Sequence, residues 1–134
     1  MKIIRGDLVI TNQTKQQDLD QIEVVAGDII SSSVMSLCMP ALMEAGDIDA
    51  QNATNVSFPL LTKARDINAS SATNLSLPLL THVEHLYATS AISVSLPLLR
   101  EAHFIDAPAA TSITLRVTPF TTINHLTEIH IQPA

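Results

Sequence analysis

The amino-acid sequence predicts an all-β fold, a right-handed parallel β-solenoid of about six coils with about 19 residues each. Prolines recur at one fixed interval along the middle of the chain, and a constant repeat of this kind is typical of stacked coils. Apolar residues within one repeat are spaced by two or three positions, whereas an amphipathic helix needs spacings of three and four. Aromatic residues are only 3% of the chain and tryptophan is absent, so the core must be built from medium-sized side chains. The repeating prolines are Pro40, Pro59, Pro78 and Pro97.

Each coil is predicted to contain two short strands on different sides. In the coil that begins at Leu61, steps of two fall at residues 67–69 and 75–77, and such a step turns both flanking side chains inward. Steps of three mark the turns between these flat segments. Residue i is expected to pair with residue i+19 between about residues 37 and 115, with right-handed crossovers. The side chains expected to be nearly fully buried are Leu61, Ile67, Leu75, Leu77, Leu80 and Leu86.

The chain is predicted to form one solenoid domain over residues 1–134. Regular coils are expected over about residues 26–115, with irregular capping coils at residues 1–25 and 116–134. The first two coils begin at equivalent Gly-Asp pairs, at positions 6 and 27, so the first coil is two positions longer than the repeat. The polar residues 13–20 are predicted to form a loop or a helical turn.

The C-terminal coil is predicted to contain an insertion. His125 follows Phe104 by two positions more than the repeat, which places the extra residues around positions 117–122. Neither end shows an obvious capping helix, and an open sheet edge invites pairing with another chain. We therefore expect a homodimer through a terminal coil or a sheet face, with the C-terminal side favoured. The apolar residues that favour it are Val117, Phe120 and Ile123.

Composition excludes several classes of protein. A net charge of −6 argues against direct binding of nucleic acid, because phosphate contacts need clustered lysine and arginine. Cys38 is the single cysteine, so no internal disulfide and no spaced-cysteine metal motif is possible. The first residues do not form a signal peptide, and no apolar run is long enough to span a membrane. We expect a cytoplasmic protein without a cofactor.

The repeat resembles a known family. Successive units contain Gly-Asp-Ile or Gly-Asp-Leu, then an apolar-Ser-apolar-Pro strand, then Leu-Thr, most clearly in NVSFPLLTKARDINASSATNLSLPLLTHVEHL. These units resemble the receptor L-domain type of leucine-rich-repeat-like right-handed β-helix, over roughly residues 4–131. The resemblance implies a ligand-binding or surface protein with no catalytic residues to transfer. The chain differs from that group in lacking cysteine-rich caps.

One predicted column is acidic. Adjacent rungs lie about 4.8 Å apart, so stacked carboxylates repel unless another group offsets them. The column could form a cation site or an acidic stripe for a basic partner. The favoured interpretation is that each aspartate caps backbone amides at the corner before its strand. The column consists of Asp7, Asp28, Asp47 and Asp66, and it continues through His85, Phe104 and His125.

A second column projects outward from the middle of the same strands. It contains Tyr87, the only tyrosine, a residue type enriched at protein interfaces. Aromatic and charged side chains are expected around it, and we predict a partner-contact surface here; the alternative is a solvated sheet face with scattered aromatics. The column is Asp49, Asn68, Tyr87 and Asp106, and its predicted neighbours are Arg65, Glu84, His85, His103 and Phe104.

Catalytic and metal chemistry have little support in the sequence. No pair of histidines has the spacing of a zinc-binding helix, so no metal site is predicted. An outward column of serine and threonine shows no partner base for a nucleophile. The favoured function is a non-enzymatic module that presents a flat sheet face to a protein partner. The alternatives are an acidic inhibitor that mimics nucleic acid, and a carbohydrate-active β-helix using Asp49, Asp106 and Tyr87.

Overall fold

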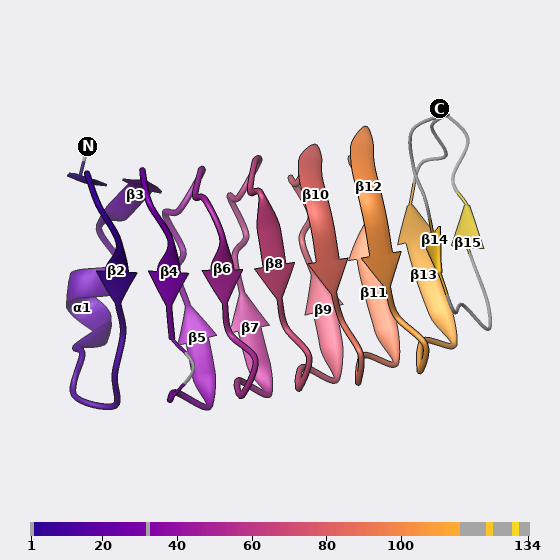
Figure 1. The fold of residues 1–134 in the computed structure, drawn as a ribbon, viewed down its shortest axis with the longest axis horizontal. Helices are drawn as coiled ribbons and strands as arrows, with labels where there is room; N and C mark the ends of the chain where they lie inside the picture. Colours follow the sequence, from indigo (N-terminus) through magenta and orange to yellow (C-terminus); the bar gives the residue numbers. More distant parts are fainter. Residues whose placement is uncertain (1, 32, 116–122, 125–129, 132–134) are drawn as a thin grey trace.

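The computed structural model describes residues 2–31, 33–115, 123–124 and 130–131. The chain winds into a parallel β-solenoid of about six turns with a spacing near 19 residues, which confirms the predicted fold class. Figure 1 shows the chain descending along a front sheet and ascending behind it as it advances from left to right, which is right-handed winding.

The longest sheet forms one side of the solenoid and has seven parallel strands, one from each successive coil. Its inward residues are aligned rung over rung, and four consecutive steps equal the predicted repeat. The aligned inward residues are Leu8, Ile29, Ile48, Ile67, Leu86 and Ile105, and the backbone of Ile123 pairs with that of Ile105. The strands are β2 (Leu8–Val9), β4 (Ile29–Ile30), β6 (Ile48–Asp49), β8 (Asp66–Asn68), β10 (His82–Tyr87), β12 (Glu101–Asp106) and β14 (Ile123–Asn124).

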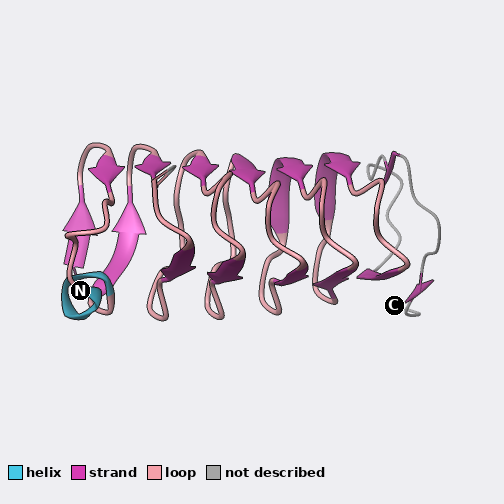
Figure 2. Cartoon of the chain, turned by 90° about the horizontal axis from the view of Figure 1, so that it is seen from below, coloured by secondary structure: helices cyan, strands magenta, loops and turns pink. Residues whose placement is uncertain are grey.

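A second side faces the opposite direction, as Figure 2 shows. It consists of a two-stranded sheet followed by a four-stranded sheet, and its regular part keeps the same register as the long sheet. Its strands are β5 (Ser36–Cys38), β7 (Asn55–Ser57), β9 (Asn74–Ser76), β11 (Ser93–Leu96), β13 (Ser112–Leu115) and β15 (His130–Ile131).

The repeating prolines occupy the corner after this second side. The backbone N–H of Leu61 donates to the carbonyl of Phe58, which closes a four-residue turn with Pro59 at its second position. Proline suits that position because its ring fixes φ near the value that the turn needs. The same hydrogen bond recurs one coil later, from Leu80 to Leu77. The proline repeat therefore sets this corner in each coil that carries the proline.

A third, narrow side was not predicted as a separate strand position. It begins with β1 (Lys2–Ile4) paired to β3 (Ile22–Val25) and continues as single parallel bridges. In the middle coils its inward residue is a small alanine, and the segment forms single bridges there. Later coils extend this segment into β10 and β12. The bridged residues are Val24, Glu44, Lys63 and His82.

The N-terminal coil contains the short helix α1 (Gln16–Leu19), so the helical turn predicted within residues 13–20 is confirmed. Leu19 is buried, and Nε2 of Gln16 donates to the carbonyl of Cys38 at 2.8 Å. The helix thus covers the N-terminal edge of the β5–β7 sheet, and the expectation that neither end carries a capping helix is wrong at this end. Four residues with one buried leucine give no helical periodicity that a sequence pattern could reveal.

The core lies between the three sides and matches the predicted columns. All six side chains expected to be buried are at most 2% exposed. The predicted alignment of the last coil is wrong, because Ile105 pairs with Ile123, one position short of the repeat and not two positions beyond it. His125, Val117, Phe120 and the proposed insertion lie outside the described residues.

Candidate functional site: the outward face of the long sheet

The acidic column links successive coils through their backbones. Oδ1 of Asp7 accepts a hydrogen bond from the backbone N–H of Asp28 at 2.8 Å. Oδ1 of Asp28 accepts the equivalent bond from the N–H of Asp47 at 2.9 Å. Each of these two carboxylates therefore caps an amide of the following coil and not of its own, whereas Asp47 binds Arg65 and Asp66 binds His85.

Glycine makes this capping possible. A Cβ atom on Gly27 would lie 2.7 Å from the backbone carbon and oxygen of Gly6, and one on Gly46 would lie 2.6 Å from the oxygen of Gly27. Real Cβ atoms do not approach this closely, so only glycine allows the coils to meet here. The close approach brings each aspartate within reach of the next amide.

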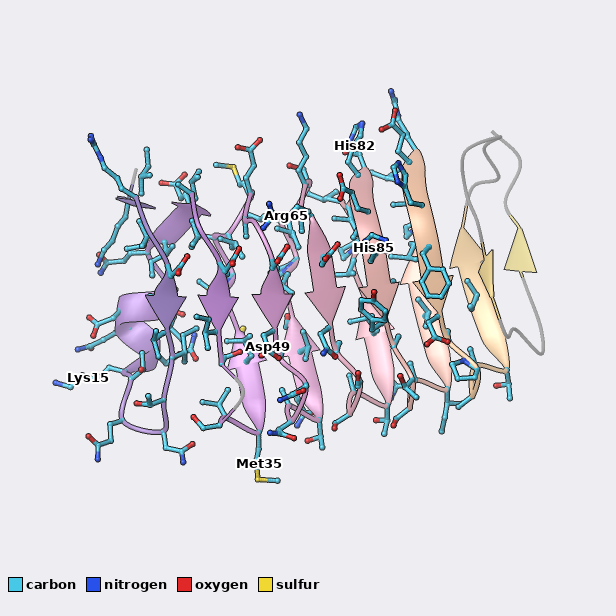
Figure 3. The ribbon with its side chains drawn as sticks, viewed as in Figure 1. Lys15, Met35, Asp49, Arg65, His82 and His85 are labelled. Carbon is cyan, nitrogen blue, oxygen red and sulfur yellow. The ribbon has the colours of Figure 1, made fainter. Side chains whose placement is uncertain are left out.

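Arg65 takes the place of glycine in the next coil and changes the pattern. Its Nε donates to Oδ1 of Asp47 at 2.7 Å, and its Nη2 lies 3.5 Å from Oδ1 of Asp28. The hydrogen bond to Asp47 and the charge of that carboxylate raise the pKa of Arg65. Figure 3 shows Arg65 among the outward side chains of the middle strands. One guanidinium thus offsets two stacked carboxylates.

Toward the C-terminal coils, the acidic column gives way to an aromatic cluster, which we define as His85, Tyr87 and Phe104. Nδ1 of His85 lies 2.8 Å from Oδ1 of Asp66. The rings of His85 and Tyr87 are stacked, with centroids 6.2 Å apart and planes 10° apart. The Phe104 ring is tilted against both, at 6.3 and 6.1 Å. All three residues are half-buried.

The predicted outward row exists, but several of its members are used locally. Oδ1 of Asp49 accepts from the N–H of Gln51, and Oδ1 of Asn68 accepts from the N–H of Ser70, so both close turns. Oδ1 of Asp106 is buried without a hydrogen-bond partner among the described residues. Parallel register aligns the row as Asp49, Asn68, Tyr87 and Asp106.

His103 does not join the aromatic cluster, although the sequence grouped them. In β10, Glu84 and His85 both face outward between the buried residues Val83 and Leu86, which makes a corner within the strand. The equivalent corner in β12 separates His103 from the cluster. His103 instead borders a shallow groove of about 330 Å³ on the third side. The groove is lined by Ala45, Lys63, Ala64, Arg65, His82, Val83, Glu84, Glu101 and His103.

Sequence reasoning missed an exposed leucine ridge. Leu60, Leu79 and Leu98 are 43%, 36% and 40% exposed and follow the prolines at equivalent corners. Each is the first leucine of a Pro-Leu-Leu triplet, and only the second leucine is buried. The turn at each proline makes consecutive side chains diverge. The Pro-Leu-Leu triplet is therefore the sequence signal that could have identified the ridge.

A second shallow groove, of about 320 Å³, lies on the second side and is lined by three serines of the outward serine and threonine column, Ser57, Ser76 and Ser95. Among the described residues, its lining contains no histidine and no carboxylate that could activate a serine. The lining residues are Val56, Ser57, Pro59, Asn74, Leu75, Ser76, Pro78, Ser93 and Ser95.

Comparison with known proteins gave no match: no family description, no curated protein and no solved structure aligns with the chain. The structure therefore supports the parallel solenoid, and no match supports the more specific assignment to receptor L domains. Among the described residues, no helix is long and apolar enough to cross a membrane.

Proposed function

We propose that this chain is a non-enzymatic protein-binding module that docks a partner protein on the outward face of the long sheet, at the aromatic cluster. The observation that carries the proposal is the contact among three half-exposed rings from two neighbouring strands. Aromatic side chains are enriched among residues that dominate binding energy. The resemblance to receptor L domains also supports a binding role, because that group consists largely of β-helices that bind ligands.

The strands around the cluster favour binding because they are already ordered. His85 is fixed by Asp66 and stacked on Tyr87, so little side-chain freedom is lost on association. Asp106 pairs in register with Tyr87, and Arg65 lies one coil away. This arrangement suits a partner that inserts an apolar side chain between the rings and sets a basic group near Asp106.

The two alternative functions gain less support from the geometry. A nucleic-acid mimic needs free carboxylates, whereas those of Asp7, Asp28 and Asp47 are occupied by amides or by Arg65. A carbohydrate-active site needs two carboxyl groups within roughly 5–9.5 Å. Asp49 and Asp106 are three rungs apart, which is about 14 Å at the usual strand spacing.

Site-specific photo-crosslinking in cells tests the proposal. A benzophenone side chain at Asn68, beside Tyr87, should capture a partner protein, and the same group at Ser76 on the opposite side serves as the matched control. The Asn68 crosslink should disappear when Tyr87→Ala and Phe104→Ala are added, because the partner loses its apolar contact. Equal capture from Ser76, or capture that survives both alanine substitutions, would contradict this binding face.

A further inference from the structure

Three potential metal ligands converge where the acidic column meets the corner in β10. Asp66 on β8 and the consecutive residues Glu84 and His85 on β10 each place one ligand atom within 4.8 Å of the others. Convergence arises because the corner turns two neighbouring side chains of β10 outward, beside the carboxylate of the adjacent rung. We propose that Asp66, Glu84 and His85 bind a divalent transition metal, with Zn²⁺ as the best fit.

The ligand chemistry supports zinc. Imidazole nitrogen and carboxylate oxygen are both zinc ligands, and a set of three protein ligands leaves the fourth tetrahedral position to water. Bonds of about 2.0–2.2 Å place tetrahedral ligands about 3.3–3.5 Å apart. Oδ1 of Asp66 and Nδ1 of His85 are 2.8 Å apart, so they need to separate only slightly.

Glu84 supplies the remaining adjustment. Its side chain is exposed and makes no hydrogen bond or ion pair with another side chain of the described residues. A side-chain rotation can therefore bring its carboxylate from the edge of the cluster into the coordination sphere. The ring of His85 is already held in position by its stacking on Tyr87.

The charge pattern of the column is a second, independent observation. Asp7 and Asp28 are each offset by an amide of the next coil, and Asp47 by Arg65. Asp66 and Glu84 bring two carboxylates beside a single imidazole, and Arg65, which is already hydrogen-bonded to Asp47, acts on Asp66 through its charge alone. Like charges this close repel, and a bound divalent cation removes that repulsion.

No sequence motif marks this site, because its ligands come from two coils. Asp66 precedes Glu84 and His85 by about one repeat, a spacing that matches no zinc motif and follows only from the solenoid register. The inference concerns metal binding alone and does not depend on the proposed partner.

Tyrosine fluorescence of the full chain provides a direct test. Tyr87 is the only tyrosine and tryptophan is absent, so the single strong intrinsic fluorophore stacks on a proposed ligand. Titration with Co²⁺ should quench this emission with one equivalent per chain, and Zn²⁺ should restore it by competition. Calorimetry with Zn²⁺ should give the same stoichiometry.

Matched variants decide whether the site is the one proposed. His85→Ala and Glu84→Gln should each weaken Zn²⁺ binding at least about tenfold, since losing even an indirect partner of a zinc ligand costs that much. His82→Ala is the control, because His82 lies beside a single carboxylate, that of Glu101, at 3.8 Å; its Zn²⁺ affinity should stay unchanged. Circular dichroism checks that each variant is folded. The proposal is overturned by absence of quenching, by unchanged affinity in His85→Ala, or by an equal loss in His82→Ala.

Discussion

Replacing Gly46 with alanine tests the idea that close contact between coils holds the acidic column together. The new Cβ atom would lie 2.6 Å from the oxygen of Gly27 and 2.8 Å from Oδ1 of Asp28, so the two coils must separate locally. Separation breaks the hydrogen bond from Gly46 N–H to Gly27 O at 3.0 Å and the bond from Asp47 N–H to Asp28 at 2.9 Å.

The expected cost follows from these two bonds. A neutral backbone hydrogen bond contributes about 0.5–1.5 kcal/mol, and one to a charged group about 1.5–3 kcal/mol. Because the Asp28 side chain is 38% exposed, the second contribution is reduced by solvent screening. We expect Gly46→Ala to lower the free energy of unfolding by about 2–3 kcal/mol.

Urea denaturation followed by circular dichroism measures this change, with Gly6→Ala as the matched control. A Cβ atom on Gly6 meets no atom within 4 Å among the described residues other than its two chain neighbours. Gly6→Ala should therefore be neutral, or slightly stabilising because alanine restricts the unfolded chain. Equal destabilisation by the two substitutions, or no effect of Gly46→Ala, would refute the close-approach argument.

Three further outcomes follow from the geometry. Leu80→Ala should cost roughly 2–5 kcal/mol, because this leucine is fully buried, whereas Leu79→Ala on the exposed ridge should cost less than half as much in the same urea titration. Arg65→Gln should lower the midpoint of thermal unfolding in dilute buffer, and the difference from wild type should shrink at high salt, because the guanidinium acts on exposed carboxylates. A raised pKa keeps Arg65 charged at neutral pH, so screening by salt, and not loss of the guanidinium charge, weakens the effect there. We propose a homodimer through the end opposite α1, for which light scattering should give twice the chain mass of 14.4 kDa; the mass of a single chain at micromolar concentration would exclude it.

The sequence predicted the register of the solenoid because corners and columns obey separate local rules. Pro59 indicates a turn because its φ is fixed. Leu61, two residues later, is buried at the position that Leu80 occupies in the next coil. Alignment by these residues also placed Asp49 and Tyr87 in one outward row, as the register shows.

Other features depend on three-dimensional proximity that no repeat pattern contains. The four-residue helix is anchored by Leu19 and by one hydrogen bond from Gln16 to a distant carbonyl. The separation of His103 from Phe104 depends on a corner inside a strand, where two neighbours face outward. The pairing of Ile105 with Ile123 depends on how the last coil closes, and a fixed period cannot anticipate it.

Because the step between coils is constant, the position of a residue within the repeat decides whether its side chain faces inward or outward. Removing residues 69–87, which make up one full repeat, would join Asn68 to Ala88 and leave every later side chain facing as before. Removing one residue more or fewer would turn inward side chains outward in the strands that follow. A chain of this kind can therefore gain or lose whole coils by duplication and deletion during evolution. Its outward surface changes one rung at a time, while the buried columns remain intact.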